Sequence, residues 1–182
     1  FDGGKRMSVL QATSVSEETT TEYQVQMDLE PEMARALSML AELELPAEDG
    51  IPMETNWHRI EMNLLIDSVH AQWRDRTDYF AGGNMFIYFS LEQVRRKSYR
   101  GPDFFVVKNV DGMRDRASWV VWKEDGRYPD VIVELASPST IRTDLSVKKQ
   151  LYEHTFRTSE YFCYDPGDKR LLGWQLTHGV YV

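Results

Sequence analysis

The alternation of apolar and polar positions is most informative between residues 131 and 136. This segment, VIVELA, is apolar except for one carboxylate, that of Glu134. Side chains of a strand alternate between its two faces, so we expect Ile132 and Glu134 on one face and Val133 and Leu135 on the other. An ionised carboxylate in the middle of an apolar strand is unfavourable by several kcal/mol unless it is paired or bound to a metal. The pattern therefore predicts a buried strand in which Glu134 has a specific partner.

A turn and a helix are predicted directly after this strand. Ser137 to Thr140 are turn-forming residues, and the spacing of apolar residues from there to Glu153 is that of a helix. Asp144, Lys148 and Tyr152 recur every four residues in this helix and therefore share one face. Taken alone, Asp144 and Lys148 also fit an ordinary surface ion pair, worth about 0.3 to 0.5 kcal/mol.

Two amphipathic helices are predicted in the first half of the chain. The first begins at Pro31, ends before Pro46 and is expected to pack as a lid on the core. Its apolar stripe comprises Met33, Ala36, Leu37, Leu40 and Leu43. The second is expected from about Asn56 to Arg76. Its apolar residues at helical spacing are Ile60, Leu64, Leu65, Val69 and Trp73.

The second helix carries His58 and Glu61, which lie one turn apart and share a face. A zinc-protease motif of this type would need a second histidine where Met62 stands. We therefore do not expect a zinc site on this helix.

Several further strands are indicated by β-branched and aromatic residues between turn signals. They are Met85 to Ser90 after a Gly82–Gly83 break, Phe104 to Val107, Trp119 to Trp122, Glu160 to Asp165, and the segment RLLGWQL from Arg170 to Leu176. The strand at Trp119 is expected at an edge or in a hairpin closed by Glu124 to Arg127. A turn from Pro166 to Lys169 and a last hairpin from Thr177 to Val182 complete the pattern.

The overall composition favours one soluble domain. A chain of 182 residues with 29 acidic residues against 21 Lys and Arg has a net charge of -8. This charge disfavours non-specific coating of nucleic acid or anionic membrane. A local basic run at Arg95, Arg96, Lys97 and Arg100 would attract a phosphate-bearing ligand, although a solvated turn explains it equally well.

The remaining compositional features predict a cytoplasmic protein. The one cysteine, Cys163, cannot form an intramolecular disulfide and is expected as a buried strand thiol. No apolar run approaches the length of a membrane-spanning helix. Residues Ser8 to Tyr23 are rich in Ser, Thr and Glu and are expected to be disordered. The first residues, FDGGKRM, are compatible with an added segment ahead of a natural start at Met7.

Two carboxylates are the candidate metal ligands. Asp103 follows Pro102 at the start of a predicted strand, and Glu134 lies 31 positions later in another. Mg²⁺ is held by a few carboxylate oxygens with several waters retained, and it can activate water and neutralise a phosphoryl transition state. A nearby lysine would hold the attacking water or the scissile phosphate.

The motifs in this order resemble the Uma-two family of PD-(D/E)XK endonucleases. They are GPDFFVV, PDVIVELASPST, a D-x-x-x-K-x-x-x-Y pattern and EYFCYDP, and the resemblance extends from roughly Pro46 to the C-terminus. It implies an α/β (α+β) fold with a restriction-endonuclease-like core, a mixed central β-sheet flanked by helices. Residues 46–182 would form this domain, after a tail and short helix in residues 1–45. The resemblance also implies Asp103 and Glu134 as the motif acids and Glu61 as an auxiliary acid.

One element of the family pattern is missing. The lysine expected two residues after Glu134 is replaced by Ala136. The resemblance suggests that Lys148 on the following helix takes its role, with Asp144 and Tyr152 beside it. Lys149 is a second choice but should point about 100° away. Asp130 lies about 13 Å along the strand from Glu134, too far to share a metal, and is assigned a capping or supporting role.

Three functions are compatible with these features. The first is a Mg²⁺-dependent endonuclease, with Mn²⁺ as a possible substitute, that hydrolyses nucleic acid, preferably DNA, and acts as a homodimer by analogy. The second is a catalytically degenerate nuclease fold that serves as a binding or assembly module, which the acidity and Ala136 favour. The third, less favoured, is a cation-binding structural protein.

Overall fold

The computed structural model describes residues 33–36, 38–40, 42–43, 45, 55–96 and 101–182. The chain divides into two compact units, Phe1–Glu44 and Leu45–Val182. In the first unit residues 33–36 and 38–40 are helical, with Met33 exposed. Leu37 and the segment from Ser8 to Tyr23 lie outside the described residues, so their predicted packing and disorder remain predictions.

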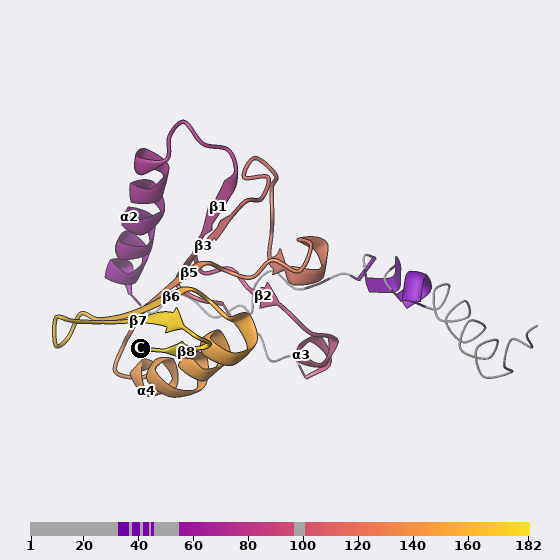
Figure 1. Cartoon of the computed structure of the whole chain (residues 1–182). Coiled ribbons are helices and arrows are strands. Elements are labelled where there is room, and N and C mark those ends of the chain that lie inside the picture. The colour runs from indigo at the N-terminus through magenta and orange to yellow at the C-terminus, as the bar shows by residue number, and fades with distance from the viewer. Residues whose placement is uncertain (1–32, 37, 41, 44, 46–54, 97–100) are drawn as a thin grey trace, which may run out of the picture. The chain divides into compact units, whose positions relative to one another are not determined.

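The second unit is built on a six-stranded mixed sheet with the strand order β1-β3-β5-β6-β7-β8 (Figure 1). Its strands are β1 (Tyr79–Gly82), β3 (Phe104–Lys108), β5 (Val131–Leu135), β6 (Glu160–Asp165), β7 (Arg170–Thr177) and β8 (Val180–Tyr181). Neighbouring strands are antiparallel except for the central pair β5 and β6, which are parallel. A parallel pair needs a crossover, and the helical segment after β5 supplies it.

The predicted strand at Trp119 is shorter than expected and is not part of a hairpin. β4 (Trp119–Val120) pairs in parallel with β2 (Ile87–Tyr88) in a separate two-stranded sheet. A 3₁₀ turn, η1 (Val121–Lys123), follows it. The burial of Trp119 explains this arrangement. Its ring is fully buried against Phe80 and Phe105. Its indole N–H donates a hydrogen bond to the backbone carbonyl of Arg127.

The helix α2 (Asn56–Gln72) lies against β1, β3 and β5. Its N-cap is Thr55, whose hydroxyl oxygen accepts a hydrogen bond from the backbone N–H of His58. The helix ends at Gln72, so the prediction to Arg76 was four residues too long. The predicted stripe was also partly wrong, because Ile60 and Leu64 are 44% and 64% exposed.

The face of α2 that packs on the sheet is rotated from the predicted one. Its partly buried residues are His58, Glu61, Met62, Leu65, Ile66, Val69 and Trp73. Which side of α2 is buried is decided by its packing on the sheet and not by the number of apolar residues alone. The rotation turns His58 and Glu61 toward the ends of β3 and β5.

Two elements were not expected from the sequence. β1 pairs with β3 in register from Tyr79 opposite Lys108 to Gly82 opposite Phe105, ahead of the predicted Gly82–Gly83 break. The short helix α3 (Leu91–Arg95) begins at the N-cap Ser90 and buries Gln93. Of the predicted strand from Met85 to Ser90, the two residues of β2 are in a ladder.

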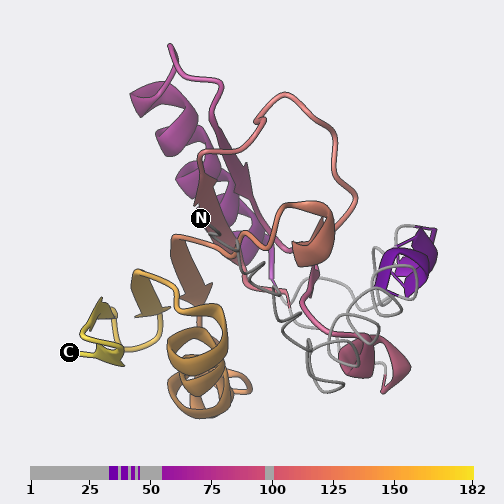
Figure 2. The ribbon, with the colours of Figure 1, turned by 45° about the vertical axis from the view of Figure 1, so that its right-hand side comes forward.

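The crossover helix begins at α4 (Ile141–Thr143), directly after the predicted turn from Ser137 to Thr140. It continues as two wide π-helical segments, η2 (Asp144–Lys148) and η3 (Leu151–Phe156), and ends at Arg157, whose φ of 56° is left-handed. Figure 2 shows these turns packed beside the sheet strands. Tyr152 and Phe156 enter the core beside Ile132 and Tyr161.

Cys163 lies buried in β6 as predicted, and burial raises the pKa of its thiol to about 12. No helix in the described part of the chain has both the length and the apolar character needed to cross a bilayer.

Candidate active site

Glu134 lies near the end of β5 and is fully buried. It faces the crossover helix together with Ile132, as the alternation in the sequence predicted. The ladder between β3 and β5 pairs Phe104 with Val133 and Phe105 with Ile132. Continuing this register by one residue places Asp103 opposite Glu134, and residues directly opposite each other in an antiparallel pair have side chains on the same face.

Both carboxylate oxygens of Glu134 have partners on the crossover helix. The Tyr152 hydroxyl donates to Oε1 at 2.6 Å, and Lys148 Nζ donates to Oε2 at 2.9 Å. Lys148 Nζ also lies 2.9 Å from Oδ1 of Asp144, an ion pair without the alignment of a hydrogen bond. The Lys148 side chain is 18% exposed, whereas Asp144 and Glu134 are buried. The pair of Asp144 and Lys148 is therefore part of a buried cluster and not an ordinary surface ion pair.

Burial and charge act in opposite directions on this cluster. Burial raises the pKa of Glu134 to about 8, although Lys148 and the Tyr152 hydroxyl favour its ionised form and Asp103 opposes it. For Lys148, burial alone would lower the pKa, but Glu134, Asp144 and Asp103 outweigh it and hold the pKa above its ordinary value. Burial and the neighbouring Glu134 raise the pKa of Tyr152. Lys148 is thus charged and Tyr152 neutral at physiological pH.

Asp103 is held from two sides at the end of β3. Its Oδ2 accepts a hydrogen bond of 2.7 Å from the backbone N–H of Leu135, and its Oδ1 lies 2.8 Å from Nε2 of His58. Burial opposes ionisation of Asp103, but the hydrogen bond and charge of His58, with Lys148, hold its pKa below the ordinary value. His58 lies in the first turn of α2, where the positive end of the helix dipole also favours a carboxylate.

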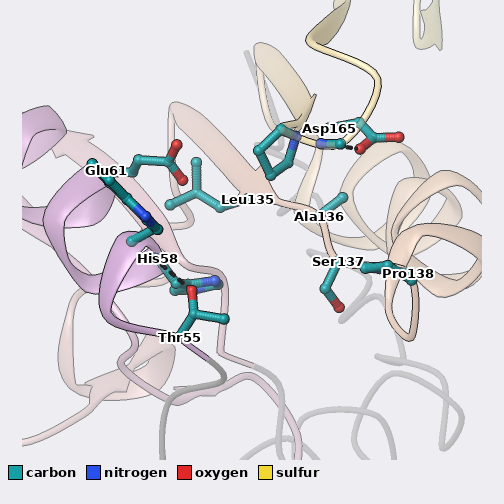
Figure 3. A pocket seen from close by; sticks show the side chains of 11 residues that line it. Thr55, His58, Glu61, Leu135, Ala136, Ser137, Pro138 and Asp165 are labelled. Carbon is teal, nitrogen blue, oxygen red and sulfur yellow. Dashed lines mark hydrogen bonds between the residues drawn. The ribbon is translucent and has the colours of Figure 1, made fainter.

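A pocket of about 140 Å³ opens beside this pair. Figure 3 shows His58 and Glu61 from α2 on one side, Ala136 and Ser137 after β5 on another, and Asp165 at the end of β6. Leu135 lines the pocket as well. Glu61 lines the pocket, whereas His58 is the α2 residue that contacts Asp103.

The other predicted site residues lie apart from this cluster. Lys149 Nζ is 4.6 Å from the centre of the Trp174 ring and does not face Glu134, as its offset on the helix predicted. Asp130 accepts a hydrogen bond from the backbone N–H of Lys108 and lies 3.4 Å from its Nζ, so it joins β3 and β5 at the end remote from Glu134. Arg95 and Arg96 are exposed, and Arg96 pairs with Glu92. Lys97 and Arg100 lie outside the described residues.

The model of the protein family Uma2, described as "Putative restriction endonuclease", matches residues 40–182 of this chain. The chain belongs to the Uma2 family. This confirms the resemblance found in its motifs, and the match contains the sheet and all the residues of the candidate site.

One solved structure shares the fold of this Uma2 protein. It is titled "Crystal structure of a putative nuclease belonging to DUF820 from Anabaena variabilis ATCC 29413", with 14% sequence identity and a TM-score of 0.50. The match covers 76% of this chain and 78% of that chain. The predicted fold, a mixed sheet with flanking helices, is therefore confirmed. No curated protein matches the chain.

His58 is the site residue that sequence reasoning missed. Its place one turn from Glu61 was noted, but the two were weighed only against a zinc motif. The available signal was the capping pattern: Thr55 begins the helix three residues earlier, so His58 projects from the first turn toward the strand ends. Which first-turn residue meets Asp103 depends on the rotation of α2, and the helical period does not specify that rotation.

The donor atoms fit a hard or borderline divalent cation with much of its water retained. In the part of the chain that the structure describes, no group of three or more His, Cys, Asp or Glu side chains is arranged to hold a metal ion. Mg²⁺ is commonly bound through one or two carboxylates plus water and substrate phosphate, so a cage of three protein ligands is not required. Asp103 and Glu134, which the ladder register places opposite each other, provide two such carboxylates.

Proposed function

We propose that this Uma2 protein is a metal-dependent endonuclease that hydrolyses phosphodiester bonds of nucleic acid, with DNA as the preferred substrate. The activity is assigned to residues 46–182. The observation that carries the proposal is the contact of Lys148 with Glu134, because it supplies a buried cation where the family pattern has lost its strand lysine. Membership of a family described as restriction endonucleases supports the same reaction class.

Asp103 and Glu134 are proposed to hold the metal, with Mg²⁺ as the expected ion and Mn²⁺ as a substitute. When bound, the ion would activate water and neutralise charge on the phosphoryl group. The two carboxylates are held by different partners. Asp103 is kept ionised by His58 and by the Leu135 N–H, while Glu134 is kept in place by Tyr152.

Lys148 is proposed to orient the attacking water or the scissile phosphate. It stays charged because three carboxylates surround it, and its side chain is partly exposed. A cation placed in this way stabilises developing negative charge without reorganisation during the reaction. Asp144 and Tyr152 fix the Lys148–Glu134 pair from either side, and Glu61, on the pocket wall, is proposed as an auxiliary acid.

The basic run that includes Arg95 and Arg96 is proposed to attract the nucleic-acid backbone toward an otherwise acidic protein. Cleavage of both strands would use two copies of the chain, so we expect a homodimer, and we expect it in the cytoplasm. Each of these features rests on the nuclease proposal.

The direct test is cleavage of plasmid and oligonucleotide substrates in Mg²⁺ or Mn²⁺ by the unmodified protein and by Asp103→Ala. The proposal predicts metal-dependent cleavage that the variant lacks. Cleavage that persists in Asp103→Ala would contradict the assignment. Retention of substrate by both proteins with cleavage by neither would favour the alternative, a nuclease fold that serves as a binding or assembly module.

A further inference from the structure

His58 and Asp103 form the closest contact between α2 and the strand ends. Nε2 of His58 lies 2.8 Å from Oδ1 of Asp103, and the two side chains are 15% and 17% exposed. Neither group is a free surface side chain, and His58 also lines the pocket that contains Glu61. Two good donor atoms therefore converge at a place that solvent can reach.

The spacing of these two atoms is that of neighbouring ligands on one ion. Bonds of about 2.1 Å at right angles in an octahedral shell put adjacent donor atoms about 3.0 Å apart. The observed separation of 2.8 Å needs only a small adjustment to meet this value. A cation could thus replace the hydrogen between Nε2 and Oδ1 without a change in the backbone.

The backbone around both groups is fixed by other bonds. Thr55 caps α2 at the backbone N–H of His58, and Leu135 N–H holds the second oxygen of Asp103. Oδ1 is therefore directed toward His58, which also lines the pocket. In contrast, both oxygens of Glu134 are engaged by Lys148 and Tyr152. The pair of His58 and Asp103 is the more accessible half of the site.

We propose that His58 is a metal ligand together with Asp103, and that this pair makes the site prefer a first-row divalent cation such as Mn²⁺ over Mg²⁺. Mg²⁺ favours oxygen donors throughout, whereas an imidazole nitrogen strengthens the binding of first-row transition metals. His58 and Asp103 occupy two positions, and water with Glu134 occupies others. This inference rests on the proposed metal site, adds His58 to its ligands and replaces Mg²⁺ with a first-row divalent cation as the preferred ion.

The test measures Mn²⁺ binding to the metal-free full chain by electron paramagnetic resonance, with Mg²⁺ as competitor. Electron spin echo modulation in the same samples detects a directly bonded imidazole nitrogen. The variants are His58→Gln, His58→Ala and Asp103→Asn, with His154→Gln as a matched control on an exposed histidine. His58→Gln keeps a side-chain N–H for Asp103 but offers no imidazole, so it separates ligation from folding.

The unmodified protein and the control should show the imidazole signal and bind Mn²⁺ about tenfold or more tightly than Mg²⁺. Both His58 variants should lose the signal, and their Mn²⁺ affinity should fall by about tenfold or more, since loss of a supporting group alone can have that effect. Asp103→Asn should lose the site. His58→Gln should melt close to the unmodified protein.

Mn²⁺ bound in an Asp103-dependent manner without the nitrogen signal would overturn the role of His58 and leave the proposed nuclease site intact. Binding that survives Asp103→Asn would overturn the metal role of both residues. A full nitrogen signal in a protein that cleaves no substrate would support the inference and refute the proposed function.

Discussion

Nζ of Lys148 lies 2.9 Å from Oε2 of Glu134, although the two residues come from a helix and from a strand that are 14 positions apart in sequence. The position two residues after Glu134 is taken by Ala136, which is buried. A long side chain can reach the same point from a different backbone origin, because the crossover helix passes back over the end of β5. The charge arrangement of the site is thereby retained with a changed sequence pattern.

Tyr152→Phe should destabilise the protein more than Tyr161→Phe. The Tyr152 hydroxyl donates to the buried carboxylate of Glu134, and loss of a partner from a buried charged acceptor costs about 1 to 3 kcal/mol. The Tyr161 hydroxyl donates to the neutral backbone carbonyl of Asp144, a bond worth about 0.5 to 1.5 kcal/mol. Urea unfolding of the two variants above pH 8, where Glu134 with its pKa of about 8 is ionised, measures the difference. An equal or reversed order would show that Tyr152 does not support the ionised form of Glu134.

Glu134→Gln should change stability with a specific pH dependence in the metal-free protein. The folded pKa of Glu134, about 8, is above its ordinary value of 4.5, so the folded state favours the protonated form. Its contribution to the free energy of unfolding is full below pH 4.5 and is lost as the pH rises through 8. The free energy of unfolding of the variant should therefore increase relative to that of the unmodified protein as the pH rises from about 5 to about 8. Thermal unfolding in the presence of a chelator measures this gain.

Asp103→Asn should show the opposite pH dependence. The pKa of Asp103 is below its ordinary value of 3.8, so its stabilising contribution is present above that pH and is lost as the pH falls further. The variant should be less stable than the unmodified protein at pH 7, and the difference should shrink in acid. If the two acids responded to pH in the same direction, the described asymmetry between them would be wrong.

Charge reversal at Arg95 and Arg96 should weaken nucleic-acid binding, most strongly at low salt, because screening reduces the attraction at high salt. The matched control reverses Arg74 and Arg127, which are also exposed. Fluorescence anisotropy of a labelled oligonucleotide over a range of salt concentrations gives both affinity and salt dependence. Equal effects of the two double variants would mean that the basic run acts only through net charge.

Local patterns were sufficient for the strand–loop–helix unit that carries Glu134 and Lys148. Alternation placed Glu134 on the same face as Ile132, and four-residue spacing placed Lys148 between Asp144 and Tyr152. These features depend on the periods of strand and helix, which short sequences specify. The long strands β3, β6 and β7 were predicted for the same reason.

Features that depend on distant contacts were missed. The buried face of α2 was predicted only in part, because its exposed side also carries Ile60 and Leu64. β4 is short and parallel because Trp119 is drawn into the core, which no local pattern reveals. The contact of His58 with Asp103 joins residues 45 positions apart and depends on the rotation of α2, which local spacing does not specify.

Lys148 is proposed to act with Asp103 and Glu134 in phosphodiester hydrolysis. Removal of one charge-stabilising donor commonly lowers the rate by about 10²- to 10³-fold, so Lys148→Ala should bind metal but cleave at that reduced rate. Lys149→Ala is the control, since Lys149 faces Trp174. Circular dichroism should show that all variants are folded.

The most direct measurement is the single-turnover cleavage rate of Lys148→Ala beside that of the double variant Lys148→Ala with Ala136→Lys. A lysine returned to the strand should restore much of the lost rate, because its amine reaches the same point beside Glu134. Full activity in Lys148→Ala alone would show that Lys148 takes no part in the reaction.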